Sequence, residues 1–422
     1  MLSDYQTIDP KRNLSVKYEN LYVIDGQITY LSLVNVELPF VNKCLNAYGW
    51  KPHIRIVTPT EAESIHNCVD EEIPLCLLND NLWYGNIGHA LWDGIYPIYQ
   101  AAAKFGYFDD DFTYLTSEMD NQNALSYNAI KTFCGGEILN HSRLSNKRLK
   151  LTTLIAGTGE AGNVVMTKDY TLSNPKDALR KFRNRMLSRF NLSLERQKDL
   201  NIIFVHNKRY SQYEQEVIQC FISINPNVRY IDWSKYSFKE QMEIIKDVDI
   251  QITGPGTGMM YMPFMKDGAV NINLGYMESS QTNYARPNIK IPNRETDFQF
   301  PAFMEQAVCN GANYVSTLYY DRYKFNNLEV EGLSEVFLDA IKLIVNNEKT
   351  TTNLNIDAQI FVEYCKRDMN NAEQLCRYLT NKAFFIELFI NEHPFAIPEF
   401  ANLKLLRQIK DEFNYNRKYE YK

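Results

Sequence analysis

The sequence has no excess of basic residues and no paired cysteine motif. Its 45 Lys and Arg residues are outnumbered by 51 Asp and Glu residues, which gives a formal net charge of −6 at pH 7. Because a surface that neutralises nucleic-acid phosphates needs clustered Lys and Arg, this balance argues against a nucleic-acid partner. The eight cysteines include no CxxC pair and no metal-ligand spacing, so we expect reduced thiols.

Long apolar runs are also missing. No stretch reaches the roughly 18 apolar residues that a membrane-spanning helix requires. Residues 1–15 contain no apolar segment typical of a signal peptide. The sequence therefore predicts a protein without a membrane span, located in the cytoplasm.

The elements that the sequence does contain predict an α/β fold with more than one core. The chain has 422 residues, of which 45% are apolar and 13% aromatic, as expected of a globular protein. Residues 20–58 predict short strands with a hairpin turn at Asp25-Gly26. Strand patterns at 201–206, 228–232, 250–254 and 269–275 alternate with helical patterns, which favours a parallel, helix-flanked sheet. We predict Rossmann-like halves at 1–197 and 198–347 that face each other across a cleft, and a helical extension at 348–422.

A glycine-rich turn follows the predicted strand at 250–254. It reads Gly254-Pro255-Gly256-Thr257-Gly258 and leads directly into an apolar helical pattern. Such a turn lets backbone amides approach an anion at a helix N-terminus, and it lies at the carboxyl end of a parallel strand, where α/β sheets bind ligands. A tight strand-to-helix connection is the alternative.

A second glycine pattern, GxGxxG, occurs at Gly157, Gly159 and Gly162. The residues after it do not read as a helix, so the fingerprint lacks the helix N-terminus on which dinucleotide binding depends. A loop lining a cleft is the simpler interpretation. A nucleotide-sugar oxidoreductase that uses this loop remains a rival hypothesis.

A polar face is predicted on the helix that begins near residue 86. Helical spacing brings Asn86, His89 and Asp93 to one side, while Trp92 points elsewhere. A His and a carboxylate one turn apart can act as a base that removes a proton from a hydroxyl. The alternative is a capping Asn followed by a buried hydrogen-bonded pair. Pro97 must kink or split this helix, and Gly106 ends it.

With these two motifs, NxxHxxxDxxxP and GPGTGMMYMPFMKDGAVNIN, the chain resembles glycosyltransferase family 61 over residues 80–345. The resemblance implies a GT-B-type fold and an inverting, metal-independent transferase that uses UDP-sugars of the xylose, arabinose or N-acetylglucosamine type. It also implies a catalytic base in the first half and a donor site in the second. The acceptor is then a glycan or glycoprotein, as in glycan assembly in the cytoplasm of a bacterium or a large virus.

The sequence departs from the family pattern at two positions. Pro255 stands where the family has His, and His206 stands where it has Arg. Arg209 matches the second basic position, and Glu214 or Glu216 stands for the acidic residue that follows it. Because Pro has no N–H, one donor contact must be made differently.

The predicted donor site combines the glycine turn with residues from neighbouring strand ends. Lys208 and Arg209 would stabilise the departing diphosphate, Trp233 would stack on a base, and Glu278 would bind sugar hydroxyls. Surface charge and core packing are the alternatives. The predicted donor-binding residues are Gly254, Gly256, Thr257, Gly258, Lys208, Arg209, Trp233 and Glu278.

On the acceptor side we predict Asp93 and His89 as catalytic residues, with Asn86 and Trp92 beside the acceptor. Two matches to the metal-binding DxD pattern, Asp109-Asp110-Asp111 and Asp247-Val248-Asp249, precede strands, whereas metal-binding carboxylates are expected where a strand ends. We therefore predict no metal and no cofactor other than the sugar nucleotide. A catalytically silent carbohydrate- or nucleotide-binding scaffold is the rival from another class.

Overall fold

The computed structural model contains two compact units. It describes residues 1–8, 15–42, 49–80, 85–116, 124–157, 178–194, 199–254, 256–274, 312, 314–320, 324–325 and 327–348. The first unit comprises Met1–Ser193 with Tyr236–Glu243, and the second comprises Leu194–Lys235 with Ile244–Lys422. The boundary at 197/198 stays a prediction, and the helical extension, apart from residue 348, lies outside the described residues.

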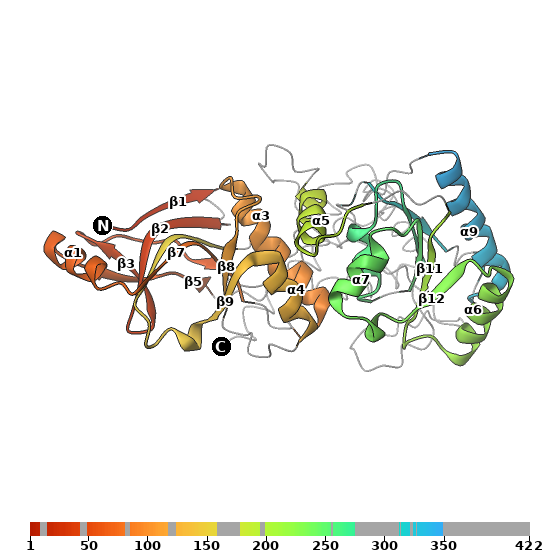
Figure 1. Ribbon diagram of the computed structural model, residues 1–422, viewed down its shortest axis with the longest axis horizontal. Helices are drawn as coiled ribbons and strands as arrows, with labels where there is room; N and C mark the ends of the chain where they lie inside the picture. Colours follow the sequence, from red (N-terminus) through yellow and green to blue (C-terminus); the bar gives the residue numbers. More distant parts are fainter. Residues whose placement is uncertain are drawn as a thin grey trace, which may run out of the picture. The chain divides into compact units, whose positions relative to one another are not determined.

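The first unit is built on a mixed sheet (Figure 1). The strand order is β6-β3-β2-β10-β7-β8-β9, and β1 pairs with β2. Strands β10, β7, β8 and β9 run parallel, while β2 is antiparallel to β10, β3 and β1. The strands span Asp4–Ile8 (β1), Ser15–Ile24 (β2), Gln27–Ser32 (β3), His53–Ile56 (β6), Glu71–Leu78 (β7), Phe112–Thr116 (β8), Gly135–Asn140 (β9) and Leu149–Ala156 (β10). Two short strands, Val41–Asn42 (β4) and Gly49–Trp50 (β5), pair separately.

The predicted hairpin turn joins β2 to β3. Asp25 and Gly26 both have positive φ angles, 50° and 78°, and Ile24 pairs with Gln27 across the turn. Two consecutive positive φ angles define the two-residue turn that suits the twist of a hairpin. The hairpin prediction is confirmed.

Helices of the first unit pack around one aromatic side chain. The helices are Pro59–Asn67 (α1), Ile87–His89 (α2), the π-helix Ala90–Ile95 (η1), Tyr96–Lys104 (α3), Leu125–Cys134 (α4) and Ala178–Arg189 (α5), with a 3₁₀ turn at His141–Arg143 (η2). Phe182 of α5 lies against the rings of Trp92, Tyr96, Tyr99 and Phe133, with centroid distances of 4.6 to 5.7 Å. This cluster joins α5 to η1, α3 and α4.

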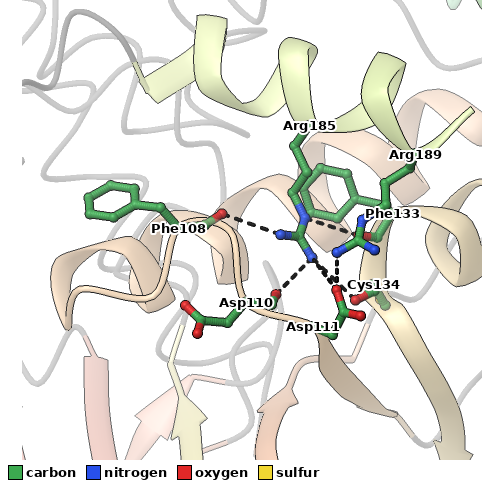
Figure 2. A network of polar contacts seen from close by, with 7 residues as sticks. All are labelled: Phe108, Asp110, Asp111, Phe133, Cys134, Arg185 and Arg189. Carbon is green, nitrogen blue, oxygen red and sulfur yellow. Dashed lines mark hydrogen bonds and ion pairs between the residues drawn. The ribbon is translucent and has the colours of Figure 1, made fainter. Parts of the chain in front are cut away.

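A buried guanidinium holds the other end of α5 (Figure 2). Arg185 donates hydrogen bonds to the main-chain carbonyls of Phe133 (3.0 Å), Asp110 (2.8 Å) and Cys134 (3.2 Å), with a weaker one to Phe108. Its side chain is only 4% exposed. Burial lowers the pKa of Arg185, yet its ordinary pKa is so high that it stays charged. One side chain therefore ties three segments of the unit together.

The second unit contains a five-stranded parallel sheet in the order β12-β11-β13-β14-β15. The strands span Ile202–Val205 (β11), Val228–Ile231 (β12), Ile250–Thr253 (β13), Val270–Asn273 (β14) and Ser316–Tyr319 (β15). The predicted parallel α/β sheet is confirmed, and β15 adds a strand that the sequence did not predict. Between consecutive strands lie Gln212–Ile224 (α6), the 3₁₀ turn Trp233–Lys235 (η5), Phe238–Ile245 (α7, mostly counted with the first unit) and the 3₁₀ helix Met259–Phe264 (η6). The helix Val330–Val345 (α9) follows β15.

The two faces of this sheet differ in polarity. One face is apolar and packs against α6 and α9 (Figure 1). The opposite face places Gln251, Asn271 and Thr317 side by side on β13, β14 and β15, each at most 2% exposed. A parallel sheet buried on both faces normally reads as apolar on both. This polar row is therefore a specific feature of the unit.

Within the described ranges, no helix is both long enough and apolar enough to cross a membrane.

Candidate functional site

The strand order of the second unit identifies where a ligand would bind. If the five strands are numbered 1 to 5 in chain order from β11, their order in the sheet is 2-1-3-4-5. In such a sheet the connections leave strands 1 and 3 in opposite directions, and a crevice forms at the carboxyl ends of these two strands. Here they are β11 and β13. The segment after β11 carries Lys208 and Arg209, and the segment after β13 carries the glycine turn.

Two buried polar side chains hold the glycine turn in place. The Tyr210 hydroxyl donates to the carbonyl of Val205 at 3.0 Å and accepts from the Gly254 amide at 3.3 Å. Gln251 donates to the Gly258 carbonyl at 3.4 Å and to Asn271 Oδ1 at 3.1 Å. Tyr210 therefore fixes the start of the turn and Gln251 fixes its end.

Arg209 lies directly beside the turn. A Cβ placed on Gly256 would be 3.1 Å from a terminal guanidinium nitrogen of Arg209 and 4.0 Å from Asn207 Nδ2. Asn207 in turn accepts a hydrogen bond from the Arg209 amide, which fixes the local turn. Lys208, by contrast, is exposed. The structure brings together Arg209 and Gly256, which the sequence predicted as one site.

The amides of Gly256 and Gly258 donate to no group among the described residues. Gly256 has a φ of +125°, which favours glycine. Gly254 differs, since its amide already donates to Tyr210. Two backbone N–H groups and one guanidinium are thus grouped at the switch point, and such a group suits an anion.

The helix predicted after Gly258 begins at Met259 but is a 3₁₀ helix that ends at Phe264. Its first bonds join residues three apart, from Met259 to Gly256 and from Met260 to Thr257. Pro263 lacks the N–H that a longer α-helix would need there. A long helix dipole is therefore absent after the turn, and the positive charge described beside the turn is the guanidinium of Arg209.

Three polar side chains, His206, Tyr230 and Asp232, lie at the ends of β11 and β12. His206 Nδ1 lies 2.8 Å from the Tyr230 hydroxyl. Hydrogen bonds from Ser234 are the main cause that holds the pKa of Asp232 below its usual range. Burial, aided by the Asp232 charge, raises the pKa of Tyr230. Asp232 is therefore an anion and Tyr230 a neutral phenol near neutral pH.

Trp233 lies close to the turn but is mostly packed. It is 9% exposed, and its ring centroid is 5.2 Å from that of Tyr261. A Cβ on Gly258 would lie 3.5 Å from its ring. Most of the Trp233 surface is therefore covered by neighbouring side chains, and its stacking on a base stays a prediction.

Replacing Gly258 by alanine should destabilise the second unit. The added Cβ would lie 2.8 Å from Val205 Cγ1, and such overpacking typically costs about 1–3 kcal/mol. Urea unfolding checks this, with Gly85→Ala as the control because no atom lies within 4 Å of its added Cβ. Equal midpoints for the two variants would show that the turn does not pack against β11.

In the first unit, Asn86 is a helix cap. Its Oδ1 accepts from the Gly88 amide at 2.9 Å, as the alternative interpretation predicted. His89 ends α2 and is half-buried. The backbone of Asp93 lies in η1, and its side chain lies outside the described part of the chain. Trp92 is 1% exposed and packs against Tyr96 and Phe182, so an acceptor would not reach it in this conformation.

Pro97 splits the predicted helix, and the π-helix η1 forms just before it. An α-helix would pair the nitrogen of residue 97 with the carbonyl of Asp93, but proline has no N–H and its ring clashes with that carbonyl. The chain forms a wider turn instead, in which the Tyr96 amide donates to the Leu91 carbonyl five residues back. The strict helical spacing of Asn86, His89 and Asp93 is therefore not kept through this turn. Gly106, with a φ of +92°, follows the end of α3 as predicted.

Two residues at the end of β7 were missed from the sequence. Asn79 is fully buried and donates to the Gly94 carbonyl of η1 at 2.8 Å. Asp80 is 7% exposed and accepts from Thr116 Oγ1 at 3.3 Å. Their position just after a central strand was a signal, because polar side chains at strand ends mark ligand-binding edges.

Three carboxylates of the two DxD matches form ion pairs with basic side chains. Asp111 is paired with Arg189 (Figure 2), Asp247 with Lys246, and Asp249 with Lys266 at 2.8 Å. Asp249 also accepts from the Asn201 amide. In the described parts of the chain, no three His, Cys, Asp or Glu side chains are grouped as a metal ion would need.

Some residues of the predicted sites have local structural roles, and others lie outside the residues that the structure describes. Glu214 is buried and caps α6 with Ser211, while Glu216 is exposed and accepts from Gln212. The Gly157 carbonyl accepts from Ser15. Pro255, Glu278, Gly159 and Gly162 lie outside the described residues.

No protein-family model matches the chain, and no curated protein matches it. The resemblance to glycosyltransferase family 61 therefore rests on the two motifs alone and stays a prediction.

Proposed function

We propose that this protein is a glycosyltransferase that moves a sugar from a UDP-sugar to a hydroxyl of a glycan or glycoprotein, with inversion and without a metal ion. The observation that carries the proposal is the position of the Arg209 guanidinium over Gly256 at the β11/β13 switch point. A diphosphate leaving group needs positive charge and N–H donors, and both are grouped there. The motif resemblance supports the same conclusion and a GT-B-type arrangement.

The reaction is a single displacement. Asp93, assisted by His89, takes the proton of the acceptor hydroxyl as its oxygen bonds to the anomeric carbon. The bond from that carbon to the phosphate oxygen breaks, and UDP leaves with the electron pair. Arg209 and the turn amides stabilise the charge that develops on the diphosphate. One displacement at the anomeric carbon inverts its configuration.

The proposal is tested by measuring UDP release from UDP-xylose, UDP-arabinose and UDP-N-acetylglucosamine. The assay is run with EDTA, both with water and with a panel of glycoside acceptors. We expect release from at least one donor, accelerated by an acceptor and unchanged by EDTA. Release that requires added divalent ions would contradict the metal-independent mechanism. Tight UDP binding without any release would instead favour a silent nucleotide-binding scaffold.

A further inference from the structure

Asn79 is a fully buried side chain that joins the sheet of the first unit to the helical turn carrying Asp93. It follows the last residue of β7, a central strand of the first unit. Its own amide donates to the Leu115 carbonyl at 3.1 Å, which continues the pairing of β7 with β8. The backbone of Asn79 is therefore held by the sheet, and its side chain extends from a rigid base.

The side chain of Asn79 contacts the residue next to Asp93. Asn79 Nδ2 donates to the Gly94 carbonyl at 2.8 Å, and a weaker contact of 3.4 Å joins the same nitrogen to the Tyr114 hydroxyl. Within the described residues, Asn79 Oδ1 has no hydrogen-bond partner. A buried amide that is only partly satisfied is unfavourable for stability, so packing alone is a poor reason for an Asn here.

The turn that Asn79 contacts departs from α-helical hydrogen bonding. Pro97 prevents the α-helical bond to the Asp93 carbonyl and opens the turn into a π-helix. Wide turns of this kind occur often at functional sites. An anchor on the Gly94 carbonyl holds the Gly94–Ile95 peptide, one residue after Asp93, and so restrains the backbone from which Asp93 extends.

From this arrangement we infer that Asn79 is a positioning residue that sets the geometry of Asp93 through the Gly94 carbonyl. The inference rests on the proposed function, because it assigns Asp93 the role of the base. Because Asn79 is fully buried, the role inferred for it is positioning and not contact with a substrate. Small misplacements of a catalytic group lower the rate by up to about 100-fold while leaving substrate binding intact.

The test compares Asn79→Ala with Tyr114→Phe, which removes only the weaker partner of the same amide. We expect Asn79→Ala to lower kcat about 10–100-fold, with the KM for the UDP-sugar and the Kd for UDP within about twofold of wild type. Tyr114→Phe should keep kcat within about twofold. Pro97→Ala, which restores the missing N–H, should also lower kcat while UDP binding is retained. This variant replaces Asn79→Ala in the test if Asn79→Ala does not fold.

A double-mutant cycle separates positioning from a general structural role. If Asn79 acts through Asp93, adding Asn79→Ala to Asp93→Ala lowers the residual rate no further. Equal losses in the presence and absence of Asp93 overturn the inference, as does an Asn79→Ala enzyme with wild-type kcat. A wild-type protein that releases UDP from no donor overturns the proposed function itself, and this inference with it.

Discussion

Asp93→Ala is expected to lower kcat for sugar transfer by about 10²–10⁴-fold, the usual contribution of a general base. The reason is that the acceptor hydroxyl then attacks without losing its proton to a positioned group. Asp93→Asn should behave in the same way, because the amide keeps the size of the side chain but is not basic. The rate is measured as UDP release at saturating donor and acceptor.

Asp109→Ala is the matched control. Asp109 is an exposed aspartate of the same unit, and it belongs to the acidic triplet for which we predict no metal. Its replacement should leave kcat within about twofold, because removing an exposed, solvated charge changes little. An Asp93→Ala protein that folds normally and transfers sugar at the wild-type rate would refute the assignment of the base.

Arg185→Ala should strongly destabilise the first unit. The change removes one donor group from the carbonyls of Phe133, Cys134 and Asp110. Each hydrogen bond to a charged group contributes about 1.5–3 kcal/mol, and unmet buried carbonyls add a penalty. We expect a total loss of about 3–5 kcal/mol, typical of breaking a buried polar network.

Hydrogen exchange in peptides from α4 and α5 measures this loss for the unit itself. The control is Arg189→Ala, four residues along the same helix. Arg189 pairs with Asp111 near the surface, with 27% of its side chain exposed, and such pairs contribute about 0–1 kcal/mol. Equal protection in the two variants would mean that the Arg185 contacts do not hold α5 in place.

Parts of the fold that depend on local signals were predictable. The Asp25-Gly26 turn and the alternation of strands and helices from β11 to β14 follow from residues that are adjacent in sequence. Strand β7 was not predicted, and it contains Pro74, a residue that normally argues against a central strand. In the structure, β7 still pairs with β10 on one side and β8 on the other, so tertiary context decided its state.

The residues of the candidate site were predictable where the local chain requires glycine. They were not predictable where contacts between distant parts of the sequence determine the structure. Gly256 and Arg209 were found because a phosphate-binding turn needs glycine and positive charge at strand ends. Tyr210 and Asn79 were not found, because each acts on a segment 44 or 15 residues away. The helical spacing of His89 and Asp93 also failed to show the π-helix, since the effect of Pro97 on hydrogen bonding depends on the actual backbone path.

The most direct test of the account is a calorimetric titration of the full-length protein with UDP in EDTA, for wild type, Arg209→Ala and Lys208→Ala. Arg209 and Lys208 are neighbours of equal charge, but only Arg209 lies beside Gly256. Loss of a charged hydrogen bond worth about 1.5–3 kcal/mol predicts that Arg209→Ala weakens UDP binding about 10–100-fold, and Lys208→Ala should change it less than about threefold. Wild-type protein that does not bind UDP, or equal losses in the two variants, would contradict a diphosphate site at the Gly256 turn.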